Sequence, residues 1–263
     1  MRKASLIAIA IVLVLAGCGN GETEAAGPAF APNQTAEAYI YIHAGYVGQA
    51  IASTNAQGEV SVQLDEAFLP HTLAAVDIDA AEWNDDNTAS YVVRGNRNFV
   101  AKYVVYNGTT YVGTTVGTSV TYVSADDQGN PAGNQDLELI IIRSQDSMAD
   151  YFSSIQNGGF GIMTEFGGSV QPVTTTSYGQ VTKRGSSYWN FGLGWQGNID
   201  AIEEFIDENG WHFNLDDMSR AAEADANDQR LWSVADAVTG ATLSDFKDYF
   251  INAQMALAQL ERN

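Results

Sequence analysis

Two hydroxyl side chains near the C-terminus are the residues best suited to carry chemistry. Residues 236–242 read Asp-Ala-Val-Thr-Gly-Ala-Thr, so Thr239 and Thr242 flank the small pair Gly240 and Ala241. A threonine hydroxyl can accept a phosphoryl group in an ester bond, and small neighbours let a phosphate approach the backbone. A helix beginning directly after Thr242 would favour the negative charge of such a phosphate.

The same residues also fit an ordinary helix cap. Thr242 is followed three residues later by Asp245, which is the spacing of a capping box. The helix that it would cap is predicted by one apolar stripe, formed by Leu243, Phe246, Phe250, Ala253, Leu257 and Leu260. Taken alone, residues 242–245 favour the cap.

The complete string from Asp236 to Thr242 resembles the flavin-attachment motif of the FMN-binding domain family. This family includes the flavin subunits of the sodium-pumping NADH:quinone oxidoreductase and of the Rnf complex, and surface lipoproteins of bacterial extracellular electron transfer. The resemblance implies FMN linked covalently to Thr242, installed from FAD by a flavin transferase with magnesium. It places Asp236, Thr239, Gly240 and Ala241 in the cofactor site, with Asp236 and Gly240 recognised by the transferase.

The resemblance covers the motif closely and residues 160–260 loosely. The family's upstream Glu-Thr-Pro-Gly-Leu-Gly element is absent, and residues 68–72, Phe-Leu-Pro-His-Thr, come nearest to it. It implies a flavoprotein that transfers electrons between membrane or surface redox partners, rather than a stand-alone enzyme. Two alternatives remain: a lipoprotein that captures a small molecule between two lobes without covalent flavin, and a flavoenzyme subunit with its own reductase activity.

A flavin ring needs neighbouring side chains. Trp232 lies four residues before the motif, and we expect it to stack on the isoalloxazine. His71 and His212 could touch the flavin or its phosphate, although lone histidines are more often structural. Other aromatic residues crowd the same half of the chain, namely Tyr188, Trp189, Phe191, Trp195, Trp211 and Phe213. The three widely spaced histidines give no metal constellation.

The N-terminus has the layout of a bacterial lipoprotein signal. Arg2 and Lys3 precede an apolar run over residues 6–15, and Leu15-Ala-Gly-Cys18 has the form of a lipobox. We expect residues 1–17 to be a signal peptide, Cys18 to be lipidated, and residues 18–37 to be a flexible tether. The protein would then be extracytoplasmic and anchored to the bacterial membrane. Cys18 is the only cysteine, so no disulfide or cysteine nucleophile is expected in the folded part.

The chain is strongly acidic. It has 12 Lys and Arg residues against 32 Asp and Glu residues, a net charge of −20. Nucleic-acid binding is excluded, because phosphate contacts need basic patches. The acidic residues are spread along the chain, which favours solubility outside the cell as their role.

Hydrophobic patterning predicts an α+β fold of antiparallel sheets and packing helices in two lobes. Residues 38–143 would form a β-rich lobe, which could be a degenerate FMN-binding-like module, and residues 144–263 the FMN-binding domain. Strands are predicted at 39–43, 46–52, 59–64, 103–106, 109–113, 118–123 and 137–142, with loops at 77–98 and 125–135. Helices are predicted around 148–155, after Asn198 up to Gly210, and at the C-terminus.

Overall fold

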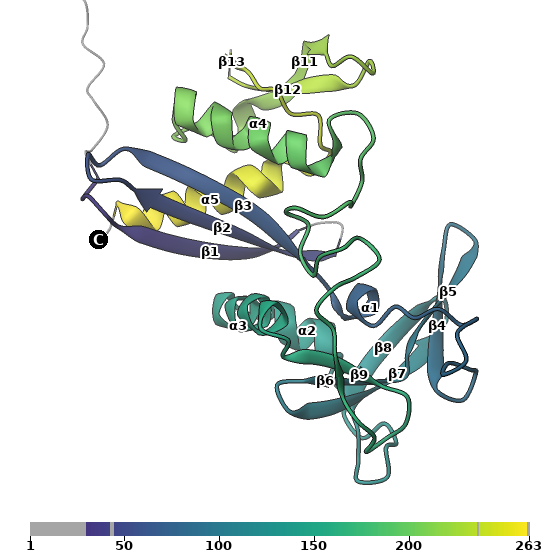
Figure 1. The fold of residues 1–263 in the computed structure, drawn as a ribbon. Helices are drawn as coiled ribbons and strands as arrows, with labels where there is room; N and C mark the ends of the chain where they lie inside the picture. The colour runs from purple at the N-terminus through teal and green to yellow at the C-terminus, as the bar shows by residue number, and fades with distance from the viewer. Residues whose placement is uncertain (1–29, 43–44, 236, 262–263) are drawn as a thin grey trace, which may run out of the picture.

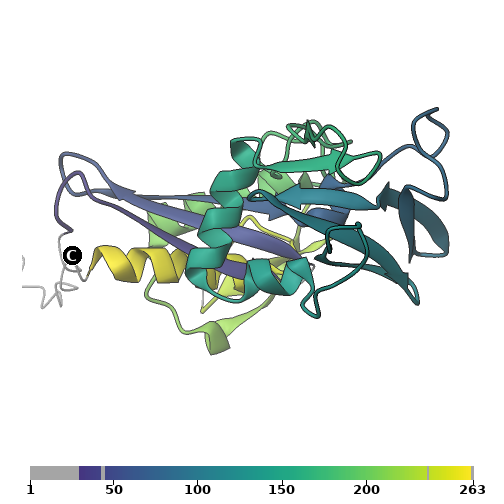
Figure 2. The ribbon, with the colours of Figure 1, turned by 90° about the horizontal axis from the view of Figure 1, so that it is seen from below.

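A three-stranded antiparallel sheet lies between the two hydrophobic cores of the molecule. Its strands are β1 (Thr35–Ile42), β2 (Tyr46–Thr54) and β3 (Val60–Phe68), in the order β1-β2-β3. One face packs against α4 (Gly194–Asn209) and α5 (Phe246–Leu260), and the other against α3 (Gln145–Gln156). Seen from below, α3 crosses one face of this sheet while α5 runs along the other (Figure 2).

This computed structural model describes residues 30–42, 45–235 and 237–261. The predicted α+β class, with antiparallel sheets and a C-terminal helix, is confirmed (Figure 1). The predicted signal peptide, Cys18, most of the tether and Asp236 lie outside the described residues. Among the described residues, no helix combines the length and the apolar character needed to cross a membrane.

The first core joins the two ends of the chain. It contains inward-facing residues of β1–β3 together with both large helices and a small sheet of β11 (Met218–Ala224), β12 (Arg230–Val234) and β13 (Ala237–Val238). A short 3₁₀ turn, η1 (Leu215–Asp217), leads into β11. The fully buried members include Ala38, Ile42, Leu64, Trp195, Ile199, Phe246, Phe250 and Leu257.

The second core is built mostly from the chain between β3 and α4. A five-stranded sheet has the order β10-β9-β6-β7-β8. Its strands are β6 (Tyr103–Tyr106), β7 (Thr109–Val116), β8 (Ser119–Ser124), β9 (Phe160–Met163) and β10 (Gln171–Pro172). The helices α1 (Pro70–Leu73), α2 (Leu137–Ile142) and α3, and the hairpin β4 (Thr88–Val93) and β5 (Asn96–Ala101), complete this lobe.

The two cores do not divide at residue 143, where the predicted lobes meet. The apolar face of β1–β3 is covered by α4 and α5 from the far end of the sequence, so the first core needs both halves of the chain. The segment between β3 and α4 forms the other lobe, below the sheet in Figure 1. Within residues 166–181 the only strand is β10, and it pairs with β9.

Two predictions of local structure are wrong. Residues 137–142 form the helix α2 rather than a strand, because the Asp136 side chain accepts a hydrogen bond from the Glu138 N–H and so caps a helix. Leu137 and Ile141 are buried at helical spacing while Leu139 is exposed. The predicted loop at 77–98 contains β4 and the start of β5.

Other local signals are confirmed. The predicted strands 103–106 and 109–113 are joined by Asn107 and Gly108, whose positive φ values of 48° and 76° suit a two-residue hairpin turn. Ser144 caps α3, and Gly210 ends α4 with φ of 78°. However, α4 begins at Gly194, so Asn198 lies one turn inside the helix rather than before it.

Candidate functional site around Thr242

Residues 239–243 form a tight turn at the edge of the small sheet. The Thr239 N–H donates to the Trp232 carbonyl (2.8 Å), and the Trp232 N–H donates to the Ala241 carbonyl (2.8 Å). The Thr239 hydroxyl accepts from the Ala241 N–H at 3.1 Å. Thr239 and Ala241 are buried, so both motif residues stabilise the shape of the turn.

Gly240 is needed because the turn lies directly on α4. A Cβ atom at this position would come within 2.9 Å of the Ala201 Cβ atom. Real Cβ atoms do not approach so closely, so any larger residue would force the turn and the helix apart. The absence of a side chain at Gly240 therefore serves packing between two elements, and not only access for a ligand.

Thr242 is held by a single amide oxygen. Asn198 Oδ1 accepts from the Thr242 N–H (2.6 Å), from the Thr242 hydroxyl (3.1 Å) and from the Leu243 N–H (3.0 Å). The Asn198 amide group donates to the Gly194 carbonyl at 2.7 Å. Asn198 is fully buried and Thr242 is only 6% exposed. The hydroxyl has a fixed orientation inside the protein.

Asn198 is a site residue that the sequence did not reveal. It lies 44 residues from Thr242 and is joined to it only by the packing of α4 against the turn. Its position before a row of isoleucines suggested a helix start, which is the only signal that it carries locally.

The helix-cap interpretation of Thr242 is wrong. α5 begins at Phe246 with Asp245 as its N-cap residue, and no side chain caps it. Thr242 therefore lies outside the helix, and its hydroxyl donates to Asn198 instead of accepting from the first turn. The related expectation that a helix begins directly after Thr242 is corrected for the same reason.

Arg220 supplies a positive charge beside the turn. Its guanidinium donates to the Thr242 carbonyl (3.0 Å), to the Arg230 carbonyl (2.7 Å) and, at 3.5 Å, to the Leu243 carbonyl. Partial burial lowers the pKa of Arg220 from its ordinary value, but a guanidinium stays charged at neutral pH. The charge next to Thr242 is therefore permanent.

The Trp232 side chain packs beside the turn and is hydrogen-bonded to it. Its indole N–H donates to the Leu243 carbonyl at 2.5 Å. The ring stacks on Phe246 with centroids 5.4 Å apart, and the Arg220 guanidinium carbon lies 4.1 Å from the indole centroid. A flavin could stack on Trp232, as expected from the sequence, only if one of these two neighbours moved.

The other candidates lie elsewhere. His212 Nε2 lies 3.2 Å from a Glu261 carboxylate oxygen, and the His212 ring stacks on Trp211 with ring centroids 3.9 Å apart. His71 belongs to the other lobe, where it contacts Glu138. No cluster of three or more metal-ligating side chains occurs in the part of the chain that the structure describes.

A second group of reactive side chains is buried near the turn. Glu66 and Lys183 form an ion pair, and Glu66 also accepts a hydrogen bond from the Tyr249 hydroxyl. The Tyr249 hydroxyl accepts from the Trp195 indole N–H at 3.1 Å. Burial raises the pKa of Glu66 and lowers that of Lys183, while their mutual attraction opposes both shifts. This network could not be predicted from local sequence patterns, because its members are far apart in the chain.

The turn and this network are electrostatically connected through Asp245. Its carboxylate further raises the pKa of Glu66 and works against the lowering of the pKa of Lys183. Asp245 lies three residues after Thr242, so the buried ion pair and the turn belong to one region of the first core.

No family model, curated protein or solved structure matches this chain. The resemblance to FMN-binding proteins therefore rests on the motif, and the function has to be argued from the geometry of the turn.

Proposed function

We propose that the chain is a lipid-anchored, extracytoplasmic electron-transfer protein that carries FMN on Thr242 through a phosphoester bond. The observation that carries the proposal is the position of Thr242 in the fold. A helix cap was the main competing explanation of the motif, and the helix begins four residues later. The motif instead forms a specific turn, with Gly240 against α4 and the Thr242 hydroxyl oriented by Asn198.

The residues of the turn fit the attachment chemistry. The Thr242 hydroxyl is the group that would accept the phosphoryl group. The Arg220 guanidinium lies 3.0 Å from the carbonyl oxygen of the same residue. A phosphoester keeps one negative charge, which is unfavourable in a chain of net charge −20 unless a cation lies close to it. Bound FMN would supply one- and two-electron transfer, so the protein needs no general base or nucleophile of its own.

Attachment requires the turn to open. Thr242 is 6% exposed and its hydroxyl proton points to Asn198 Oδ1. Thr242 Oγ1 must leave Asn198 and bond to the FMN phosphorus of FAD, while AMP departs and the hydroxyl proton is released. Asn198 and Arg220 would hold the turn before this step, and Arg220 would remain close to the charged product.

The site lies away from the expected anchor. β1 begins and α5 ends at the same end of the first lobe (Figures 1 and 2), and the Thr242 turn precedes the other end of α5. A helix rises about 1.5 Å per residue, so the length of α5 separates these ends by roughly 20 Å. A flavin on Thr242 would therefore lie roughly 20 Å from the end of the lobe at which β1 begins.

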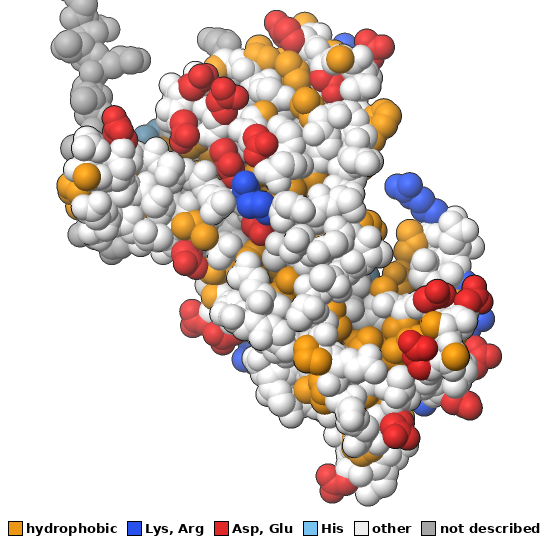
Figure 3. All heavy atoms as spheres, in the orientation of Figure 1, with side chains coloured by type: hydrophobic (Ala, Val, Ile, Leu, Met, Phe, Trp, Pro, Cys, Tyr) orange, Lys and Arg blue, Asp and Glu red, His pale blue; other side chains and the backbone are white. Residues whose placement is uncertain are grey.

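The surface agrees with a protein exposed to solvent outside the cell. Asp and Glu side chains are scattered over the visible face, with few Lys or Arg side chains among them (Figure 3). A basic redox partner would be attracted by such a surface, and its association would weaken with increasing salt.

The proposal is tested by producing the chain together with a flavin transferase and separating the denatured protein on a gel. Flavin fluorescence should stay on the protein band of the wild type and of Ser244→Ala, an exposed hydroxyl two residues away. It should be lost in Thr242→Ala. A wild-type protein that folds but carries no flavin would support the alternative, a binding lipoprotein without covalent flavin.

A further inference from the structure

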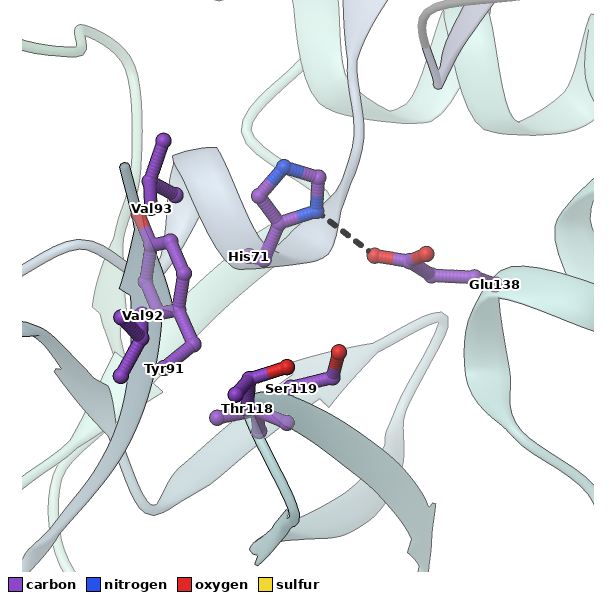
Figure 4. A pocket seen from close by; sticks show the side chains of 8 residues that line it. His71, Tyr91, Val92, Val93, Thr118, Ser119 and Glu138 are labelled. Atoms are coloured by element: carbon purple, nitrogen blue, oxygen red, sulfur yellow. Dashed lines mark hydrogen bonds and ion pairs between the residues drawn. The ribbon is translucent and has the colours of Figure 1, made fainter. Parts of the chain in front are cut away.

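A cavity of about 280 Å³ lies in the second lobe, away from the Thr242 turn. It is lined by α1, β4, β8 and α2 and is open to solvent on one side. Figure 4 shows His71 and Glu138 along one side, Tyr91 and Val93 of β4 opposite them, Val92 on the far side of the same strand, and Thr118 and Ser119 below. The proposed electron-transfer function uses none of these residues.

The polar side of the cavity is dominated by one carboxylate. Glu138 Oε1 bonds to His71 Nδ1 at 2.8 Å, which leaves the second oxygen, Oε2, outside that interaction. The hydroxyls of Thr118 and Ser119 line the cavity floor (Figure 4). An ionised carboxylate only accepts hydrogen bonds, and the two hydroxyl oxygens can also accept them, so this side suits a ligand group that donates several hydrogen bonds.

The opposite side is apolar and open to solvent. Val93 is 48% exposed, although it is a large aliphatic residue in a strand. The Tyr91 ring meets His71 edge-on, with ring centroids 6.0 Å apart, and so forms an aromatic wall between the polar and apolar sides. Contact with the apolar part of a small molecule would remove these side chains from water.

The negative charge of Glu138 and of the whole protein favours a positively charged ligand. An anion would approach Glu138 within a protein of net charge −20, which is unfavourable at short and long range. A cation gains from the same field, from a charge-assisted hydrogen bond to Glu138 and from the Tyr91 ring. The volume is at the small end for ligand sites and corresponds to a single substituted ring.

We propose that this cavity binds a small organic ammonium ion, a primary amine with a compact apolar body. The ammonium group donates to Glu138 Oε2 and to the hydroxyls of Thr118 and Ser119. The apolar body lies against Val93 and the Tyr91 ring.

Three probes of nearly equal shape test the proposal on the full mature chain: benzylammonium, benzyl alcohol and benzoate. Calorimetric titration should show benzylammonium binding about tenfold more tightly than benzyl alcohol, the difference expected for one charged hydrogen bond, with benzoate weakest. Equal binding of the three, or preference for benzoate, would overturn the proposal.

Variants locate the site. Glu138→Gln should remove the preference for benzylammonium over benzyl alcohol, while Glu165→Gln, an exposed carboxylate of the same lobe, should leave it unchanged. Val93→Thr keeps the shape of an exposed side chain and should weaken the binding of both benzylammonium and benzyl alcohol. An unchanged preference in Glu138→Gln would contradict the assignment. Thr242→Ala should still bind benzylammonium. A failure of amine binding and a failure of flavin attachment can therefore be distinguished.

Discussion

At the scale of single residues, one amide group holds the turn that contains Thr242. Asn198 Oδ1 accepts three donors from the turn, two of them main-chain N–H groups of Thr242 and Leu243. Buried main-chain donors cost free energy when they have no partner. Asn198 therefore both orients the hydroxyl and stabilises the turn that presents it.

Asn198→Ala should lower the free energy of unfolding by about 2–4 kcal/mol, because it leaves two buried N–H groups without an acceptor. Urea denaturation would measure this. The control is Asn209→Ala, which loses a bond of the same kind, from a side-chain amide to the carbonyl four residues earlier, at the exposed end of the same helix. Equal effects of the two substitutions would show that Asn198 does not hold the turn.

At the scale of elements, the helices and turns that are formed by interactions between neighbouring residues could be predicted from the sequence pattern. The Asn107-Gly108 hairpin, α3 with its Ser144 cap and the apolar stripe of α5 could all be predicted from neighbouring residues. The short apolar run at 137–142 could not, because six such residues fit a strand or a helix equally until the Asp136 cap is considered.

The site was predictable only in part. The motif itself identified Thr242 and the small residues, since they are contiguous in sequence. The contacts that give them their geometry come from Asn198, Ala201 and Arg220, which reach the turn through packing of α4 and β11. Such non-local contacts leave no periodic signal in a single sequence.

Packing between the turn and α4 gives a prediction at this scale. Gly240→Ala should destabilise the protein by about 1–3 kcal/mol, because the added methyl group meets Ala201. Ala201→Gly alone should cost about 1 kcal/mol through helix propensity. The double variant should lose less unfolding free energy than the sum of the losses in the two single variants, as measured by a double-mutant cycle. Simple additivity would mean that the two residues do not touch.

At the scale of the whole molecule, a buried ion pair marks the junction of the two cores. Lys183 Nζ lies 3.3 Å from the ring centroid of Tyr46 and 4.2 Å from that of Tyr188, and both tyrosines pack against both cores. Glu66, its partner, is on β3, the last strand before the chain enters the second lobe. The pair therefore couples the sheet to the segment that returns from that lobe.

Lys183→Met should destabilise the chain by about 3–5 kcal/mol, because Glu66 would be left charged and unpaired in the core. Adding Glu66→Gln should recover much of this loss, since the remaining side chain is neutral. The exposed pair of His212 and Glu261 provides the comparison: Glu261→Gln should change the free energy of unfolding by less than about 1 kcal/mol. A double variant as unstable as Lys183→Met would contradict the argument.

Alkaline pH should also weaken the fold. Burial, aided by the hydrogen bond to Glu37, raises the pKa of Tyr39 to about 12, and burial, aided by the Asp150 charge, raises that of Tyr106 to about 12. The folded state thus favours the neutral phenols, and their contribution is complete below the ordinary tyrosine pKa of 10.0 and is lost as the pH rises towards about 12. Urea midpoints should fall over this interval, and less steeply in Tyr39→Phe. A flat profile would show that these phenols ionise freely.

The attachment of FMN to Thr242 can be tested by locating the modification within a peptide. Trypsin cleaves after Arg230 and Lys247, and the peptide between them contains Thr242 together with Ser233, Thr239 and Ser244 as competing hydroxyls. After maturation with a flavin transferase, fragment masses should assign the flavin phosphate to Thr242. Its assignment to Ser233, Thr239 or Ser244, or an unmodified peptide from folded protein, would contradict attachment at Thr242.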